Sequence, residues 1–164
     1  MLRYEARTDA TPPTVWALMA CPTRWSEWAP HVRGAWGLGW PQVREGALGA
    51  AKLWGVAPVP AKVTRVDPGE SWAWRVGLVT IDHRVEELPD DEGALIAITM
   101  DAPGPLEGLL ERTYGPIAER LIRRLAQVSD DAIALGLEAC RKRTESPYGD
   151  LPSRNNAGSA NVGA

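Results

Sequence analysis

Polar and apolar residues alternate in several segments of the chain, which is the pattern of strands with one buried face. Leu2, Tyr4 and Ala6 alternate with charged residues and predict a first strand at the amino terminus. Between residues 31 and 101 we expect six further strands, separated by turns rich in glycine and proline. Short connections between them favour an antiparallel meander. The expected strands cover residues 31–37, 46–54, 59–67, 71–76, 79–88 and 94–101.

Helical patterns precede and follow the later strands. Thr11 and the two prolines after it are typical of a helix start, and a second short helix is expected between Pro22 and Pro30. Beyond residue 103 the apolar spacing becomes helical, and Gly115-Pro116 should kink or restart this long amphipathic helix. Its apolar stripe comprises Leu106, Leu109, Leu110, Ile117, Leu121, Leu125, Val128, Ala132, Leu135 and Ala139.

The order of these elements predicts an α+β fold. A curved antiparallel sheet of about seven strands that wraps around the last helix would bury the apolar faces of both. A sheet and a helix do not fill one another completely, so a ligand cavity is expected between them. We place this domain at residues 1–145 and expect residues 146–164, rich in Pro, Gly, Ser and Asn, to be a flexible polar tail.

The composition narrows the functional classes. No segment approaches the ~20 apolar residues that span a bilayer, and the charged amino terminus does not resemble a signal peptide, so we expect a cytoplasmic protein without membrane insertion. A net charge of −3 gives no electrostatic basis for binding nucleic acid. The two histidines and two cysteines have no metal-type spacing, so we expect no metal and no cofactor. Cys21 and Cys140 are interpreted as free thiols.

His83 is the first candidate functional residue. In the strand 79–88 it shares the apolar face with Ile81 and Val85, whereas Asp82 and Arg84 should point outward. A histidine on an inner sheet face is either a core residue held by a hydrogen bond or the polar contact of a ligand cavity. In the second case it could act as a general acid or base, or donate to a ligand carbonyl.

Tryptophan is the preferred aromatic residue, with eight Trp and no Phe. Trp72 and Trp74 share one face of the strand 71–76 and should lie beside Ile81 and His83, as a ligand-binding wall or as core. Arg75 on the opposite face is the competing polar group, which could bind a carboxylate if it pointed inward. The expected ligand-binding residues are Trp28, Trp36, Trp54, Trp72, Trp74, Ile81 and Ile98.

Tyr114 is the second candidate for proton transfer. It precedes Gly115-Pro116, where a kink would bring its hydroxyl to the cavity mouth, to donate to a ligand oxygen or to stabilise an enolate. The alternative is a core tyrosine. His31, at a junction between a loop and a strand, is interpreted as a partly exposed rim residue.

Several segments resemble the START-like or Bet v 1-like (SRPBCC) superfamily, particularly its polyketide cyclase/dehydratase branch. The resemblance covers about residues 1–143 and implies a helix-grip fold with a deep hydrophobic pocket. The superfamily includes cyclases, dehydratases, lipid carriers and receptors, and no catalytic motif transfers residue by residue. The segments are Thr14–Met19 (TVWALM), Arg24–Pro30 (RWSEWAP), Glu45-Gly46 and Asp67–Arg75 (DPGESWAWR).

These observations favour a protein that binds a small hydrophobic, polyketide-like or polycyclic molecule and promotes cyclisation, dehydration or a related rearrangement. Catalysis would come from shaping the ligand and from proton transfer by His83 and Tyr114. One alternative is a carrier in which the same residues serve only for affinity. Another is a partner-binding module with an exposed patch at Trp25 and Trp28. The sequence leaves open the ligand, the reaction and whether the protein is a monomer or a homodimer.

Overall fold

The structure is a computed structural model and describes residues 1–53, 58–89 and 92–134. Trp54, Cys140 and the predicted tail at 146–164 therefore lie outside the described residues. One antiparallel sheet of seven strands has the order β1-β7-β6-β5-β4-β3-β2. The strands are β1 (Leu2–Thr8), β2 (Val32–Trp36), β3 (Leu48–Leu53), β4 (Val59–Asp67), β5 (Ser71–Val76), β6 (Val79–Glu87) and β7 (Ala94–Asp101).

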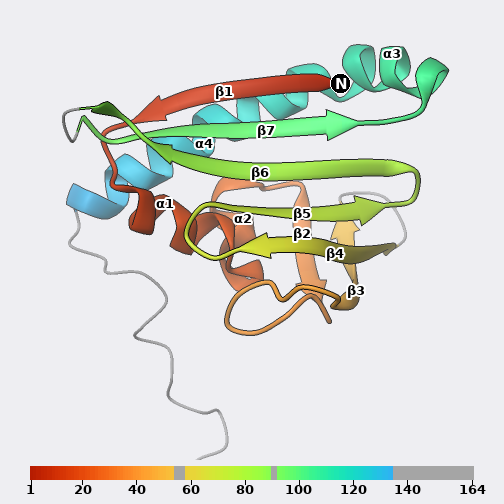
Figure 1. The fold of residues 1–164 in the computed structure, drawn as a ribbon, viewed down its shortest axis with the longest axis horizontal. Coiled ribbons are helices and arrows are strands. Elements are labelled where there is room, and N and C mark those ends of the chain that lie inside the picture. The colour runs from red at the N-terminus through yellow and green to blue at the C-terminus, as the bar shows by residue number, and fades with distance from the viewer. Residues whose placement is uncertain (54–57, 90–91, 135–164) are drawn as a thin grey trace, which may run out of the picture.

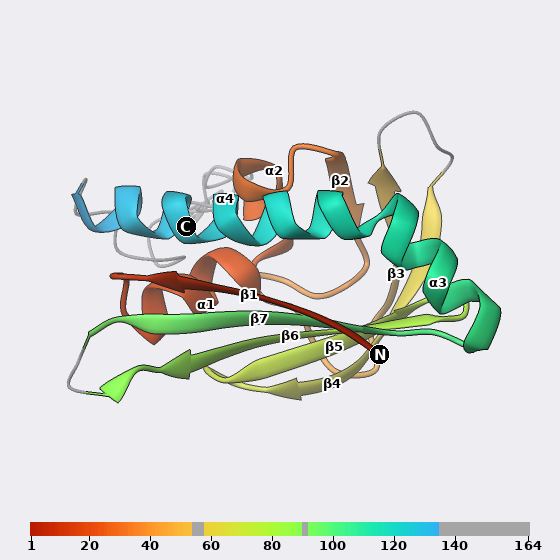
Figure 2. The same cartoon turned by 90° about the horizontal axis from the view of Figure 1, so that it is seen from above.

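The helices cover one face of this sheet. Between β1 and β2 lie α1 (Pro12–Met19), a 3-10 turn (Pro22–Arg24) and α2 (Trp25–Trp28); α3 (Gly104–Thr113) and α4 (Gly115–Ala134) follow β7. Figures 1 and 2 show α4 running along the sheet, with α1 beside it and with β2 bent toward its level. Because α4 packs on β1, β7, α1 and α2, the arrangement is the predicted α+β helix grip.

The chain restarts its helix at Gly115, as the Gly115-Pro116 pair predicted. Tyr114 is the residue between the two helices, and its N–H still donates to the carbonyl oxygen of Leu110 at 2.8 Å. The predicted apolar stripe is wrong on either side of this break, since Leu109 is 57% and Ile117 is 42% exposed. The break resets the helical phase. The side chains of α4 that are buried are Ala118, Leu121, Ile122, Leu125, Ala126, Ser129 and Ala132.

A β-bulge in β4 separates the two faces of the sheet. The register shifts between Val63, which pairs with Trp74, and Arg65, which pairs with Ala73. The additional residue, Thr64, moves Arg65 to the outer face, where it would not lie under strict alternation. The bulge therefore keeps a guanidinium out of the core.

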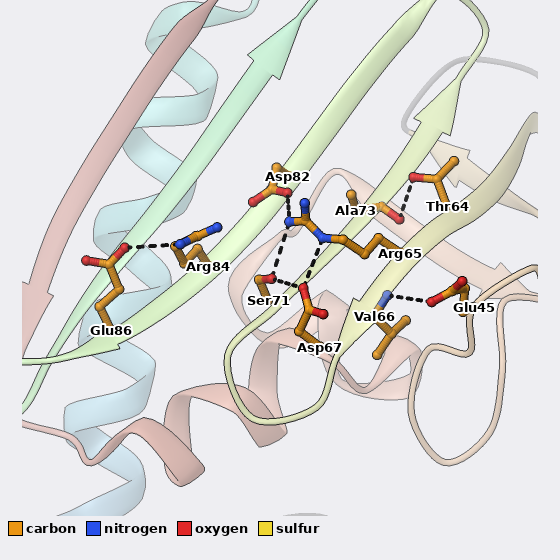
Figure 3. A network of polar contacts seen from close by, with 10 residues as sticks. All are labelled: Glu45, Thr64, Arg65, Val66, Asp67, Ser71, Ala73, Asp82, Arg84 and Glu86. Carbon is orange, nitrogen blue, oxygen red and sulfur yellow. Dashed lines mark hydrogen bonds and ion pairs between the residues drawn. The ribbon is translucent and has the colours of Figure 1, made fainter.

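Arg65 is the centre of a polar network on that outer face (Figure 3). Its Nε lies 3.0 Å from Oδ2 of Asp67, and its guanidinium also forms an ion pair with Asp82. Burial raises the pKa of Asp82, and the neighbouring Arg65 opposes that shift. Asp82 and the exposed Arg84 point outward, as predicted.

Cys21 corrects one sequence-based interpretation. Its side chain is fully buried and is disulfide-bonded, so it is not a free thiol. The sequence around Cys21 contains no second cysteine at a characteristic spacing, and it therefore could not indicate this bond.

Candidate functional site

The inner face of β5 and β6 carries a group of stacked rings that we call the tryptophan–histidine cluster: Trp25, Trp72, Trp74 and His83. Trp72 lies directly opposite His83 and Trp74 opposite Ile81, as the alternation predicted. The rings of Trp72 and His83 stack with centroids 4.1 Å apart and planes at 5°. Trp25, from α2, also stacks with Trp72, at 5.4 Å and 6°.

Trp74 meets the other rings at their edges. Its ring plane lies at 68° to Trp25, 65° to Trp72 and 61° to His83, with centroids 5.2 to 6.2 Å apart. Edge-to-face contacts of this kind are favourable between aromatic rings. The cluster thus combines a parallel stack with one indole that crosses it.

Three polar atoms of this cluster are buried without a hydrogen-bond partner in the described part of the chain. They are Nε1 of Trp72, Nε1 of Trp74 and Nδ1 of His83. By contrast, Nε1 of Trp25 donates to the carbonyl oxygen of Met19 at 2.9 Å. Because buried polar atoms are almost always paired, three unpaired ones on one apolar face mark a place where polar atoms of a ligand could bind.

Burial determines the protonation of His83. The side chain is 5% exposed, and burial lowers its pKa to about 3, although the neighbouring Trp72 backbone acts in the opposite direction. The imidazole is therefore neutral near neutral pH. A general base works best when its pKa is close to the operating pH. This environment thus suits His83 to hydrogen bonding better than to proton transfer.

The lowered pKa of His83 predicts a pH-dependent stability. Below its ordinary pKa of 6.5 the unfolded chain binds a proton that the folded chain does not, so stability falls as the pH falls toward 3. Between about pH 7 and pH 5 this contributes a loss of about 2 kcal/mol, which His83→Gln should remove. Urea unfolding of wild type and variant at each pH measures the difference. If the free energy of unfolding changed with pH in the same way in wild type and in His83→Gln, His83 would not be held neutral in the folded chain.

A second polar pair joins two distant segments of the chain. The Tyr114 hydroxyl lies 3.1 Å from Nε2 of His31, and the two rings meet at 68°. Both side chains are half-buried. Burial raises the pKa of Tyr114 to about 12 and lowers that of His31. His31 was interpreted only as a rim residue, because nothing in the local sequence relates it to a tyrosine 83 positions away.

The other expected site residues are spread over several environments. Trp28 is 4% exposed and donates its N–H to the carbonyl oxygen of Leu18 at 3.2 Å, which leaves it no free polar atom for a ligand. Trp36, on the edge strand β2, is 50% exposed and is not a core residue. Ile81 is half-buried, and Ile98 is buried opposite His83.

Two alternatives left open by the sequence are decided by burial. Arg75 is exposed on the outer face, so His83 is the inward-facing polar group of the two. The hypothesis of an exposed patch at Trp25 and Trp28 is wrong, because both indoles are core residues with 2% and 4% exposure.

Two surface clefts lie away from the tryptophan–histidine cluster. One, of about 330 Å³, opens on the outer face at Arg75, Thr80 and Asp101. The other, of about 290 Å³, lies between α4 and Pro30 and is lined by Arg120, Arg123 and Arg124. Neither cleft is lined by a ring of the cluster, so the candidate site is distinct from both.

A seven-stranded sheet that grips a long helix defines a helix-grip protein. In this chain the inner face of the sheet also carries stacked indoles. The chain belongs to the polyketide cyclase/dehydrase and lipid transport family, whose sequence profile matches residues 2–130. This confirms the resemblance to the polyketide cyclase/dehydratase branch. No curated protein matches the chain by sequence. Among the residues that the structure describes, no helix is both long and hydrophobic enough to span a bilayer.

Solved structures share the fold at low sequence identity. NE0264 from Nitrosomonas europaea is 13% identical with a TM-score of 0.66, over 81% of this chain and 96% of that chain. DynU16, described as a protein in the dynemicin biosynthetic locus, is 17% identical with a TM-score of 0.61, over 82% of this chain and 47% of that chain. KanY is 17% identical with a TM-score of 0.56, over 78% and 95%. At these identities the similarity concerns the fold alone.

Proposed function

We propose that this protein binds a small hydrophobic, polyketide-like or polycyclic molecule on the inner face of the sheet, and promotes its cyclisation, dehydration or a related rearrangement. Membership of the family supports a hydrophobic ligand, and the description of DynU16 supports a biosynthetic setting. The observation that carries the proposal is the group of buried atoms of Trp72, Trp74 and His83 that have no partner among the described residues.

The chemistry of these atoms suggests how they would act on a ligand. An indole N–H is a donor only, so Trp72 and Trp74 match acceptor oxygens such as those of ketones and enols. In an aldol-type ring closure a carbon beside one carbonyl gives up a proton to water and forms a bond to a second carbonyl carbon, whose oxygen then takes up a proton from water. Negative charge develops on the carbonyl oxygens before that proton arrives. Donors fixed in an apolar site stabilise that charge. The ring of Trp74, which is only partly buried, would help to hold the ligand in the folded shape that ring closure needs, and no cofactor takes part.

The indole N–H groups can be tested by substitutions that keep an aromatic ring at each position. The double substitution Trp72→Phe and Trp74→Phe should weaken binding of the polycyclic ketone 9-fluorenone about tenfold or more, because two hydrogen bonds of about 1 kcal/mol each are lost. Binding of fluorene, the same ring system without the oxygen, should change little. Quenching of the fluorescence of the remaining tryptophans measures both affinities.

Trp40→Phe is the matched control, since Trp40 is 71% exposed and lies outside the cluster. It should leave both affinities unchanged. Equal losses of fluorenone and fluorene binding in the double variant would contradict a role for the N–H groups in ligand binding.

A non-catalytic carrier is the second candidate, and the neutral, stacked His83 favours it, because an imidazole with a pKa of about 3 takes up no proton near neutral pH. Mass spectrometry of a poly-β-ketone incubated with the protein separates the two functions. Loss of water, or a new ring at unchanged mass, supports catalysis. Recovery of the unchanged ketone after binding supports the carrier.

A further inference from the structure

His31 and Tyr114 border the same inner face of the sheet as the tryptophan–histidine cluster. One row of opposed residues crosses the inner face from Trp72 through His83 and Ile98 to Tyr4. At the end of this row the Tyr4 hydroxyl would lie 2.8 Å from a Cβ on Gly115, the residue after Tyr114. The row of inner-face residues therefore ends at the break between α3 and α4.

His31 approaches this region from the side of α2. Trp25 of α2 stacks in the cluster, and the chain reaches His31 three residues after the end of α2, immediately before β2. The Tyr114–His31 hydrogen bond thus joins the break between α3 and α4 to the segment from α2 to His31. That segment contributes Trp25 to the tryptophan–histidine cluster. Within the described residues, this is the only hydrogen bond of the Tyr114 hydroxyl.

The direction of this hydrogen bond fixes the tautomer of His31. Burial keeps the phenol protonated and the imidazole neutral near neutral pH. A phenol is a stronger acid than an imidazole N–H, and an imidazole nitrogen is a stronger base than a phenol oxygen, so the hydroxyl donates to Nε2. A neutral imidazole carries one proton, which must then reside on Nδ1.

The Nδ1–H group of His31 is consequently a buried donor, and it has no partner in the described part of the chain. We propose that His31, with its proton held on Nδ1 by Tyr114, donates a hydrogen bond to an oxygen atom of the ligand. Tyr114 is then a positioning residue that acts through His31. This inference rests on the proposed function and adds a fourth unpaired atom to the three of the cluster.

Nitrogen NMR of the full chain tests the tautomer without any ligand. The chain has two histidines, and His31→Gln assigns their ¹⁵N signals. Wild type should show a protonated Nδ1 and an unprotonated Nε2 at His31. Tyr114→Phe should shift His31 toward the Nε2–H tautomer that free histidine side chains prefer. An Nε2–H tautomer in wild type would overturn the inference.

Binding of two matched probes tests the ligand contact. The probes are anthraquinone, whose second carbonyl oxygen is left for His31 when the first accepts from Trp72 and Trp74, and anthracene, which lacks both oxygens. His31→Phe should weaken binding of anthraquinone about five- to tenfold, as the loss of one hydrogen bond does, and anthracene binding should change less than about twofold. Tyr114→Phe should produce a smaller loss in the same direction. His31→Gln, whose amide can accept from Tyr114 and donate to the ketone, should retain most of the affinity.

The outcomes distinguish this inference from the proposed function. If neither probe binds wild type, the proposed function fails, and the inference fails with it. If both bind and His31→Phe weakens them equally, only the inference fails. Thermal unfolding confirms that each variant is folded. Should His31→Phe not fold, the His31 tautomer and the anthraquinone affinity of Tyr114→Phe test the inference instead.

Discussion

Replacement of Trp72 by alanine is expected to lower the free energy of unfolding by about 3–5 kcal/mol, the range for loss of a large buried aromatic side chain. Trp72 is 1% exposed, and its ring stacks with both His83 and Trp25. Its removal would leave a cavity between β5, β6 and α2 that these rigid elements cannot close.

Urea unfolding measures this loss. Trp40→Ala is the matched control, because the Trp40 side chain is 71% exposed and its removal should change stability by no more than about 0.5 kcal/mol. Trp72→Phe, which preserves part of the stack, should fall between the two. If Trp72→Ala and Trp40→Ala were equally mild, the stacked rings would not belong to the core.

Gly93→Ala should be among the most damaging exchanges of a single hydrogen for a methyl group, with an expected loss of about 3 kcal/mol or more. An added Cβ would lie 2.1 Å from the carbonyl oxygen of Thr8 and 2.8 Å from Cα of Asp9. Both are backbone atoms that cannot turn aside. They are also anchored, since the Thr8 hydroxyl and the Asp9 N–H both donate to Asp130 of α4.

Gly69 provides a control for the backbone conformation. Its φ of +88° is close to the +99° of Gly93, but an added Cβ would have no atom within 4 Å. Gly69→Ala should therefore cost only the conformational strain, about 1–2 kcal/mol. Thermal unfolding of both variants isolates the steric contribution. Equal decreases of Tm in Gly93→Ala and Gly69→Ala would mean that the backbone of β1 at Thr8 moves away from the added methyl group at little cost. That result would contradict the steric argument.

The inner face of β5 and β6 could be predicted because two local signals agree. Alternation assigned Trp72 and His83 to the apolar faces of neighbouring strands. The turn at Gly77-Leu78, between Val76 and Val79, then left the pairing register almost no freedom. Strand pairing across a two-residue turn is determined locally. The sequence could therefore predict that Trp72 and His83 lie side by side.

The contacts that bring α2 and the helix break to this face could not be predicted. A four-residue helix shows no periodicity, so nothing indicated that Trp25 would stack on Trp72 rather than face solvent. The Tyr114–His31 bond depends on how two segments 83 residues apart pack together. Such contacts follow from the whole fold, and a local pattern carries no information about them.

The bulge at Thr64 places in β4 a residue that has no partner of its own in β5. The Thr64 side chain is exposed, and its hydroxyl donates only to the carbonyl oxygen of Ala73 at 3.2 Å, so many residues should be tolerated there. Deletion of Thr64 should also be tolerated, because Arg65 would then follow Val63 directly, remain opposite Ala73 on the outer face and leave Val66 opposite Trp72. Loss of a residue from the paired part of β4 should be tolerated less well than loss of the bulged residue, because it would exchange the two faces of the strand on one side of the deletion.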